Sequence, residues 1–553
     1  MQFQLTRDQE HIQRTVREFA ENTVAPRSVD LDANNVFPPD LVKQMAGLGI
    51  MGLPFPEEYG GAGKDIITYA VAVEELSRVD GGVGVILSAH TSLGSWPIFG
   101  FGTEEQKQKY LTPMARGEKI GAFGLTEPNA GSDAAGTETT AKREGDAYVL
   151  NGKKIFTTNA SHADVIIVFA VTAPGTGTHG ISAFIVEKAW EGVSLGQHYD
   201  KMGIRCSGTQ ELHFKNVKVP AENLLGKEGE GFKIAMETLD GGRIGIAAQA
   251  LGIAQGAYEQ ALEYAQERVQ FGKPIARQQV IGFKLADMYA KIRAARFMVY
   301  SAAWEKAHHI PYGIDAAAAK MYASDICLEV VNDALQIFGG NGYIKGFAVE
   351  RMYRDAKICT IYEGTNEIQR LVISSGLLGK AKKDKADPEK PAGGRKKVII
   401  RDGSAQEKVD AFVRHVKESG VLAKAAGNHD DVSTASRLVC VGMGLKEQGD
   451  LAMMEHLAAE LEAAFGCSRP VAEERRWMPM GAFVGLSGKK FKGGLYLGLG
   501  ISGQIQHMAG LKESGVITAV NIDPAAPIFE GCDYGIVGDM YEIVPLLAKA
   551  LKS

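Results

Sequence analysis

Four short segments within the first 380 residues carry side chains that could act together on a ligand. TEPNAGSD at 126–133 places hydroxyl groups and bare backbone in a turn, which suits hydrogen bonds to a flat heterocycle and to a phosphate-bearing chain. RVQFG at 268–272 offers a guanidinium fork for a pyrophosphate beside an aromatic ring. QIFGGNGY at 336–343 allows close approach of the backbone to a ligand. Taken alone, these three have ordinary interpretations as a turn, a surface arginine and a helix terminator.

The fourth segment, RDAKICTIYEGTNEIQRL at 354–371, contains Glu363 between Tyr362 and Gly364. A lone glutamate is usually a solvated surface charge. Here the apolar and aromatic neighbours predict that the Glu363 carboxyl is partly desolvated. Desolvation raises the pKa of a carboxyl toward the range that a base needs in order to remove a proton from a weak carbon acid.

The elements that must position these segments follow the order helical, strand-rich, helical. Residues 1–120 are predicted to be helical, beginning where Thr6 and Gln9 form a capping-box pattern. Residues 121–230 contain short alternating or apolar runs, among them AYVLNGKKIF around Asn151-Gly152, which indicate a β domain. Residues 231–380 return to long helical patterns rich in Ala, Leu and Gln.

A lysine-rich stretch, KAKKDKADPEKPAGGRKK at 380–397, follows the helical block. Because it has almost no apolar content, it is predicted to be a solvated linker rather than a targeting or anion-binding tract. Residues 398–435 show no clear helix or strand pattern. The sequence therefore predicts a basic linker followed by an unassigned segment over 381–435. From 436 to 553 strands alternate with helices, which predicts a mainly parallel sheet of Rossmann-like type.

Composition limits the classes of function. The chain has 553 residues, 45% hydrophobic and 23% charged, as expected for a globular protein with several cores. A net charge of -5 with interspersed signs gives no field suited to a nucleic acid. The sequence shows no targeting segment and no apolar run of bilayer length, so a cytoplasmic location is expected. Six cysteines without a CxxC pair argue against a metal site or disulfide framework, so electrons would travel on an organic cofactor.

Read together and in order, TEPNAGSD, RVQFGKP, QIFGGNGY and YEGTNEIQRL make the sequence from Leu5 to about Lys380 resemble an acyl-CoA dehydrogenase. The resemblance implies an N-terminal helical domain, a β-barrel-like middle domain and a C-terminal four-helix bundle, with FAD between the last two and a homotetrameric assembly. It also implies that Glu363 removes the α proton of an acyl-CoA while the β hydride passes to the flavin N5. The family directs the flavin ribityl hydroxyl and the backbone N–H of the catalytic Glu at the thioester oxygen.

Other roles are carried over by position. The resemblance implies that the isoalloxazine is lined by Phe123, Leu125, Thr126, Phe156 and Thr158. It implies that the ADP half of FAD is held from a neighbouring subunit by Arg268, Phe271 and Gln279, joined by Gln336 and Gly340. The flavin site would be completed by Thr365 and Glu367, and the CoA substrate would lie near Ser132, Asp240, Arg243 and Gly364. Phe156 stands where many relatives have Trp, and a flat ring is kept.

TLDGGRIGIAAQALGIAQGA at 238–257 resembles the short-chain, butyryl-type members of the family. Gly242 precedes Arg243 in the region where branched-chain members can carry the catalytic Glu, which favours Glu363 and a linear short acyl chain. The sequence leaves open whether the enzyme oxidises butyryl-CoA or reduces crotonyl-CoA.

The last block, from about Ser436, resembles the C-terminal FAD-binding domain of the electron-transfer flavoprotein α subunit. The resemblance rests on GCSRP, VGLSGK, GISGQIQHMAG, VNIDPAAPIF and DYGIVGD, in that order. It implies a second FAD, with Arg469 over the isoalloxazine, Ser487 near N5 and His507 near O2. The diphosphate and adenosine would be held by Ser502, Asn521 and Asp539. Leu486 departs from the family, where Gln usually precedes the hydroxyl residue.

These observations favour an FAD-dependent short-chain acyl-CoA dehydrogenase with a tethered flavin relay. The α subunit's own N-terminal domain and a β subunit are not recognisable, so a separate redox partner is expected. An electron carrier or CoA-binding scaffold without turnover is the alternative that the intact Glu363 motif opposes. An acyl-CoA oxidase is a third reading, in which the electron-carrier domain would be superfluous.

Overall fold

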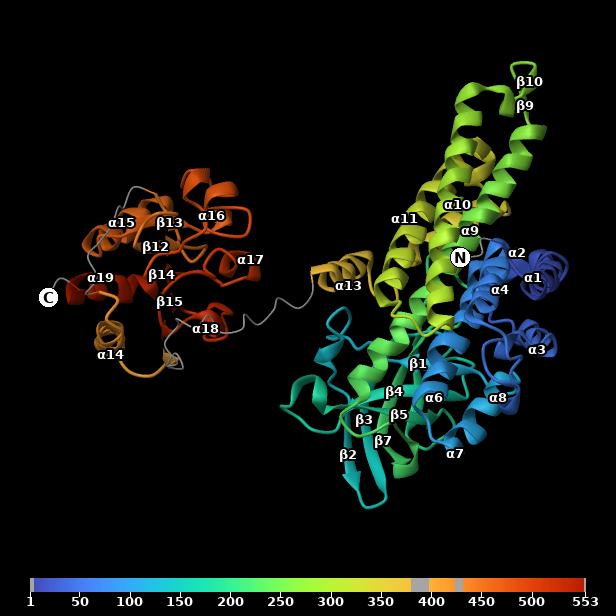
Figure 1. Ribbon diagram of the computed structural model, residues 1–553, viewed down its shortest axis with the longest axis horizontal. Coiled ribbons are helices and arrows are strands. Elements are labelled where there is room, and N and C mark those ends of the chain that lie inside the picture. The colour runs from blue at the N-terminus through green and yellow to red at the C-terminus, as the bar shows by residue number, and fades with distance from the viewer. Residues whose placement is uncertain (1–3, 379–396, 423–430, 552–553) are drawn as a thin grey trace. The chain divides into compact units, whose positions relative to one another are not determined.

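The computed structural model describes residues 4–378, 397–422 and 431–551 and divides the chain into two compact units, residues 1–385 and 386–553 (Figure 1). The linker predicted at 380–397 lies outside the described residues except for its last residue. No helix of the described ranges is both long and apolar enough to cross a bilayer.

The first unit begins with short helices. Their bounds are α1 Arg7–Phe19, α2 Ala25–Asn34, α3 Pro39–Gly47, α4 Ile66–Val79, α5 Gly81–Ser88, α6 Trp96–Phe101, α7 Glu104–Gln106 and α8 Thr112–Ala115. The predicted capping box at the start of α1 is confirmed, because Thr6 Oγ1 accepts the Gln9 N–H at 3.3 Å and Gln9 Oε1 accepts the Thr6 N–H at 2.9 Å. One face of α1 buries Val16 and Phe19.

A sheet follows the helices. Its strands are β1 Gly121–Gly124, β2 Thr140–Glu144, β3 Ala147–Thr157, β4 Val165–Val171, β5 Ile181–Glu187, β6 Val193–His198, β7 Gln210–Pro220 and β8 Leu224–Leu225. The strand order is β6-β7-β3-β2-β4-β5-β8, with β1 parallel to β4. Successive side chains of β4 enter two different cores, since Ile167 packs in one and Ile166 in the other. Asn151-Gly152 lies inside β3, where the register against β7 shifts between Leu150 and Gly152.

Long helices complete the first unit. They are α9 Gly231–Glu267, α10 Gln279–Ala307, α11 Gly313–Phe338, α12 Ala348–Ile358 and α13 Asn366–Leu378, with the hairpin β9 Val269–Gln270 and β10 Lys273–Pro274 between α9 and α10. Helix α9 packs against α4, α10 and α11. A Cβ at Gly252 would lie 2.3 Å from the Glu74 carbonyl oxygen of α4, so only glycine allows this approach of the two helices.

The second unit is a parallel sheet with helices between its strands. The elements are β11 Val398–Ile400, α14 Ala405–Glu418, β12 Arg437–Val441, α15 Leu451–Glu460, β13 Ala464–Cys467, α16 Arg469–Glu473, β14 Leu495–Leu499, α17 Ile505–Met508, β15 Val516–Asn521, α18 Ile528–Gly531, β16 Tyr534–Val537 and α19 Met540–Leu551. The strand order is β11-β16-β15-β14-β12-β13, and every pair is parallel. Separate hydrophobic cores contain Val439 and Cys440, so successive side chains of β12 are buried in different clusters.

Part of the segment that the sequence left unassigned belongs to this sheet. Strand β11 pairs with β16, and helix α14 packs on α19. Helix α14 starts with a capping box of Ser404 and Glu407 and buries Val409, Phe412 and Val416. That spacing is a helical pattern that could have been recognised from the sequence.

Candidate active site and second ligand cavity

Glu363 lies in the turn between α12 and α13. Its φ is +52° and that of Gly364 is +86°, both in the left-handed region. Glycine adopts this conformation without cost, whereas a glutamate is strained there. Strain of this kind persists only where surrounding contacts over-determine the backbone, and it is concentrated at functional sites.

The Glu363 carboxyl is enclosed, as its apolar neighbours predicted. The residue as a whole keeps partial exposure, but Oε2 is buried and has no hydrogen-bond partner in the described part of the chain. Burial raises the pKa of Glu363 to about 8, against the opposing charges of Arg243, Lys320 and Lys306. In the substrate-free chain this carboxyl is therefore largely protonated at neutral pH, and it becomes able to accept a proton as the pH rises toward 8.

Helix α9 supplies the wall beside this carboxyl. Gly242 leaves room for Glu363, and Gly241 leaves room for Lys306, whose Nζ would lie 2.2 Å from a Cβ at position 241. The Lys306 ammonium lies 3.8 Å from the centre of the Trp96 ring, and burial lowers the Lys306 pKa to about 7. Lys306 is thus a second buried titratable group whose charge acts on Glu363.

Asp240 and Arg243, the predicted substrate contacts on α9, form an ion pair with each other. Arg243 is buried, and its Nε has no hydrogen-bond partner among the described residues. Burial raises the pKa of Asp240 against the charge of Arg243. The structure thus brings Asp240, Arg243, Glu363 and the adjoining Gly364 into one charged cluster.

The turn around Glu363 is anchored by residues that the sequence reasoning missed. The Tyr362 hydroxyl donates to Gln249 Oε1, and Gln249 Nε2 donates to the Gly81 carbonyl at 2.8 Å. On the other side, Lys320 and Gln369 donate to backbone carbonyls of the turn. A lysine directly after four alanines, DAAAAK at 315–320, was the available signal for a charged group on a buried helix face.

The predicted isoalloxazine contacts of the middle domain occupy two connected segments. These contacts are Phe123, Leu125, Thr126, Phe156 and Thr158. The Ile155 N–H donates to the Thr126 carbonyl at 2.8 Å. A buried ion pair supports both segments, since Lys154 Nζ lies 2.5 Å from Glu127 Oε1 and donates to the Leu125 carbonyl at 3.1 Å. Phe156 has φ +55° and is 59% exposed, so a flat apolar face is available there.

The remaining predicted flavin contacts of the first unit separate into two groups. Thr365 and Glu367 form one group at the start of α13, next to Glu363. Ser132, which was predicted as a substrate contact, is exposed in the turn after β1. The other group lies at the β9–β10 end of the long helices, where Figure 1 shows the hairpin far from the middle sheet. That group consists of Arg268, Phe271, Gln279, Gln336 and Gly340.

One chain does not bring this second group to Glu363. Arg243 lies within the 37-residue helix α9 and Arg268 is its C-cap residue, about 37 Å away at the usual rise per residue. Phe271 is 93% exposed with φ +51°. An aromatic side chain held this far into solvent on a tight hairpin is suited to contact another molecule.

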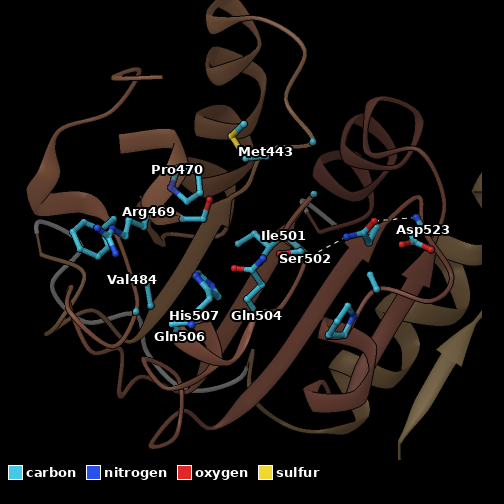
Figure 2. A pocket seen from close by; sticks show the side chains of 18 of the residues that line it. Met443, Arg469, Pro470, Val484, Ile501, Ser502, Gln504, Gln506, His507 and Asp523 are labelled. Atoms are coloured by element: carbon cyan, nitrogen blue, oxygen red, sulfur yellow. Dashed lines mark hydrogen bonds between the residues drawn. The ribbon is translucent and has the colours of Figure 1, made fainter. Parts of the chain in front are cut away.

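The second unit contains a cavity of about 1040 Å³ at the carboxyl ends of β12, β14 and β15 (Figure 2). Ligands of open parallel sheets bind at this edge, and the volume is at the upper end of the range for ligand sites. All six residues predicted to hold a second flavin line it together: Arg469, Ser487, Ser502, His507, Asn521 and Asp539.

His507 points into this cavity with one nitrogen unsatisfied (Figure 2). It is 7% exposed, Nε2 lies 2.7 Å from the Tyr496 hydroxyl, and Nδ1 has no hydrogen-bond partner among the described residues. Burial lowers the pKa of His507 to about 4, so the ring is neutral. Asn521 is fixed by bonds to the Ile501 carbonyl and the Asp523 N–H.

Arg469 and Leu486 mark the open side of the cavity. Arg469 is exposed and donates to Glu473 Oε1 at 3.2 Å, four residues along α16. Leu486, the departure from the family pattern, is 63% exposed. No group of three or more potential metal ligands occurs in the described ranges.

Comparisons with known proteins cover both units. Residues 6–118, 122–217 and 229–378 match the N-terminal, middle and C-terminal domains of acyl-CoA dehydrogenases, and residues 431–512 match the electron transfer flavoprotein FAD-binding domain. The chain is 56% identical over 378 residues to the short-chain specific acyl-CoA dehydrogenase of Clostridium acetobutylicum, covering 68% of this chain and 100% of the relative.

Two solved structures are similar to this chain, with sequence identities close to that of the Clostridium acetobutylicum relative. One is butyryl-CoA dehydrogenase from Megasphaera elsdenii, with a TM-score of 0.68 and 52% identity over 68% of this chain and 100% of that chain. The other is a chain in the structure of the electron transferring flavoprotein of Acidaminococcus fermentans, with a TM-score of 0.68 and 55% identity over 69% of this chain and 100% of that chain. This chain therefore belongs to the acyl-CoA dehydrogenase family and carries an electron transfer flavoprotein FAD-binding domain behind the dehydrogenase domains.

Proposed function

We propose that the chain is an FAD-dependent dehydrogenase of short, linear acyl-CoA thioesters such as butyryl-CoA, running in oxidation or in the reverse reduction of crotonyl-CoA. The observation that carries the proposal is the buried, unpartnered Oε2 of Glu363, whose pKa lies near 8. A base with this pKa suits a proton beside a thioester carbonyl. The short-chain and butyryl-CoA relatives support the choice of acyl group.

In the oxidation, Glu363 Oε2 takes the α proton of the thioester, and the electrons of that C–H bond form the Cα=Cβ double bond. Bound FAD supplies the acceptor for the β hydrogen and its electron pair. Negative charge develops on the thioester oxygen as the proton leaves, so hydrogen-bond donors must be directed at it. The backbone N–H of Glu363 has no partner in the described part of the chain and is a donor that the turn leaves free for this oxygen.

The residues present fit an FAD at this site. Phe156 offers an exposed ring at the end of β3, and the Lys154–Glu127 ion pair fixes the adjoining Leu125–Thr126 segment. We propose that Phe123, Leu125, Thr126, Phe156, Thr158, Thr365 and Glu367 contact the flavin of their own chain. We also propose Ser132, Asp240, Arg243 and Gly364 as contacts of the CoA substrate.

We propose that the ADP half is held by another copy of the chain. Its contacts at the hairpin end, with Arg268 and Phe271 exposed, are too far along α9 to reach a flavin beside Glu363. An assembly of several copies resolves the separation, and the family resemblance favours a homotetramer. On the same reading, the first-unit domains end near residues 120, 230 and 380, with a barrel-like middle sheet and a helical bundle.

We propose that the cavity of the second unit takes a second FAD on a Rossmann-like sheet. The unsatisfied Nδ1 of the buried, neutral His507 would face the flavin, and Ser502 and Asn521 would hold the phosphate-bearing part. The unit would then relay electrons between the first flavin and an outside redox partner, such as the remaining electron-transfer flavoprotein subunit. The six free and buried cysteines suit a reducing compartment such as the cytoplasm.

Anaerobic mixing with butyryl-CoA tests the proposed reaction. The flavin absorbance should bleach, and crotonyl-CoA should form. Butyryl-CoA should exceed octanoyl-CoA in kcat/KM, because a short-chain enzyme would close its acyl pocket soon after the β carbon. Absence of bleaching would indicate a carrier or scaffold, and a preference for octanoyl-CoA would overturn the acyl-chain assignment. Rapid reoxidation by air, with no gain from a protein or dye acceptor, would indicate an oxidase.

A further inference from the structure

Lys320 is an interior ammonium in the middle of α11 with no exposed surface. Its Nζ donates to the Gly364 carbonyl at 2.8 Å and to Asn366 Oδ1 at 2.9 Å, both uncharged acceptors. Among the described residues, Lys320 forms no ion pair within 4.0 Å. Burying a cation without a carboxylate partner is costly, so such a group is retained where its charge or its hydrogen bonds serve the site.

The hydrogen bonds of Lys320 belong to a set that fixes the turn carrying Glu363. Gln369 Nε2 donates to the Glu363 carbonyl at 3.0 Å and to the Gly364 carbonyl at 2.8 Å. The Asn366 side chain is itself fixed by α11, because its Nδ2 donates to Ser324 Oγ at 2.9 Å and to Asp325 Oδ1 at 2.7 Å. The carbonyl oxygens of residues 363 and 364 are therefore both bound on the α11 and α13 side.

Binding these carbonyls restricts the directions in which the other groups of Glu363 can point. The residue has φ +52°, so its backbone is not in a conformation that glutamate adopts by preference. With the carbonyls of 363 and 364 held and Tyr362 anchored on the preceding side of the turn, fewer directions are open to the N–H and the Cα–Cβ bond of Glu363. Neither the N–H nor the buried Oε2 of Glu363 has a hydrogen-bond partner in the described chain.

We propose that Lys320 is a positioning residue for the base Glu363: its ammonium and the Gln369 amide hold the 363–364 carbonyls so that the N–H and carboxyl of Glu363 converge on the thioester. The inference rests on the proposed role of Glu363. Burial lowers the pKa of Lys320 to about 8, and while Lys320 is protonated its charge opposes the rise in the Glu363 pKa.

Other charges act on the same carboxyl. Arg243 acts on it from α9 and Lys306 from α10, and Asp240 is paired with Arg243. The hydroxyls of Tyr69 and Tyr362 lie in the same surroundings. Lys320 differs from the other cations because it also binds the backbone of the turn. Its removal should therefore change both the geometry and the ionisation of Glu363, whereas removal of the Gln369 amide should change the geometry alone.

The test compares Lys320→Met, Lys320→Gln and Gln369→Met in the full, FAD-loaded protein. The measurement is anaerobic flavin reduction by butyryl-CoA as a function of pH. We expect both Lys320 variants to shift the acidic limb of the pH–rate profile to higher pH by roughly one unit, because the loss of one nearby positive charge raises the pKa of Glu363. We expect Lys320→Met and Gln369→Met to reduce the maximal rate by at least about tenfold, with the limb unmoved in Gln369→Met.

Lys320→Gln keeps one donor for the Gly364 carbonyl, so it should retain more of the maximal rate than Lys320→Met. Binding of crotonyl-CoA, read from the flavin spectrum, should change little in every variant, which separates positioning from a general loss of structure. If Lys320→Met fails to fold, the other two variants still decide the question. Lys284→Met is the matched control, since Lys284 reaches the distant end of α11 at Asp333, and it should behave as the wild type.

The inference is overturned if the acidic limb of the pH–rate profile lies at the wild-type pH in both Lys320 variants. It is also overturned if Gln369→Met and Lys320→Met both keep the wild-type maximal rate. Failure of the proposed function has a different signature. In that case butyryl-CoA would reduce the flavin of Glu363→Gln at the wild-type rate, whatever the rates of the Lys320 variants.

Discussion

Glu363 on the α12–α13 turn and Gly242 on α9 share one space: a Cβ built at Gly242 would lie 2.0 Å from Glu363 Oε2. Real Cβ atoms do not approach an oxygen this closely, so the carboxyl occupies the volume that any side chain at position 242 would fill. Gly242 of TLDGGR and Glu363 of YEGTNE are far apart in the sequence but are therefore packed against each other in the fold. The absence of a side chain at 242 is a requirement of the site.

Gly242→Ala should displace the carboxyl while preserving most of α9, because alanine is a better helix former than glycine. We expect the rate of flavin reduction by butyryl-CoA to fall by about a hundredfold or more, since a small misplacement of a reacting group has effects of that size. Gly47→Ala is the control, because Gly47 is exposed with nothing within 4 Å of its Cβ position, and it should be silent. A wild-type rate in Gly242→Ala would show that Glu363 does not act from this position.

The raised pKa of Glu363 predicts the direction of the pH dependence. The carboxyl must be ionised to accept a proton, and its pKa lies near 8 in the free enzyme, above its ordinary value of 4.5. We therefore expect kcat/KM to rise with pH up to about 8 and then level off, because kcat/KM reports the ionisation of the free enzyme. A profile already flat from pH 5 upward would mean that the base ionises as an ordinary carboxyl.

Counting flavins tests the second site. The full chain should release two FAD per polypeptide, one from each unit, since the cavity at the carboxyl ends of β12, β14 and β15 gathers all six predicted contacts. A chain ending at residue 385, the boundary of the first unit, should bind one FAD and keep flavin reduction by substrate. It should pass electrons to the outside partner more slowly, because the tethered relay is lost. One FAD in a fully folded chain would contradict the relay.

Local patterns predicted what local chemistry determines. The capping box of Thr6 and Gln9 follows from immediate neighbours and is confirmed. The desolvation of Glu363 was predicted from its neighbours in sequence and is also confirmed, but α9 supplies the wall that encloses the carboxyl. The capping box of Ser404 and Glu407 is equally local. Helix α14 was nevertheless not predicted, because the stretch before it is poor in apolar residues and resembles a linker.

Other features depend on packing between distant elements. A lysine is expected at the surface, so nothing local predicted that Lys306 would lie over the Trp96 ring or that Lys320 would bind the Gly364 carbonyl. Both burials result from the way α9, α10 and α11 pack around the turn of Glu363. The distance between Arg268 and Glu363 is likewise a property of the length of α9, which a motif does not reveal.

The central claim is that Glu363 is the base, and one measurement tests it most directly: anaerobic reduction of the bound flavin by butyryl-CoA in Glu363→Gln beside the wild type. Glutamine preserves the shape of the side chain and removes its ability to take a proton. The account predicts that the variant retains FAD and binds crotonyl-CoA, while its rate of flavin reduction falls by about a hundredfold to ten-thousandfold. Reduction at a near-normal rate in a fully loaded Glu363→Gln protein would contradict it and assign the proton to another group.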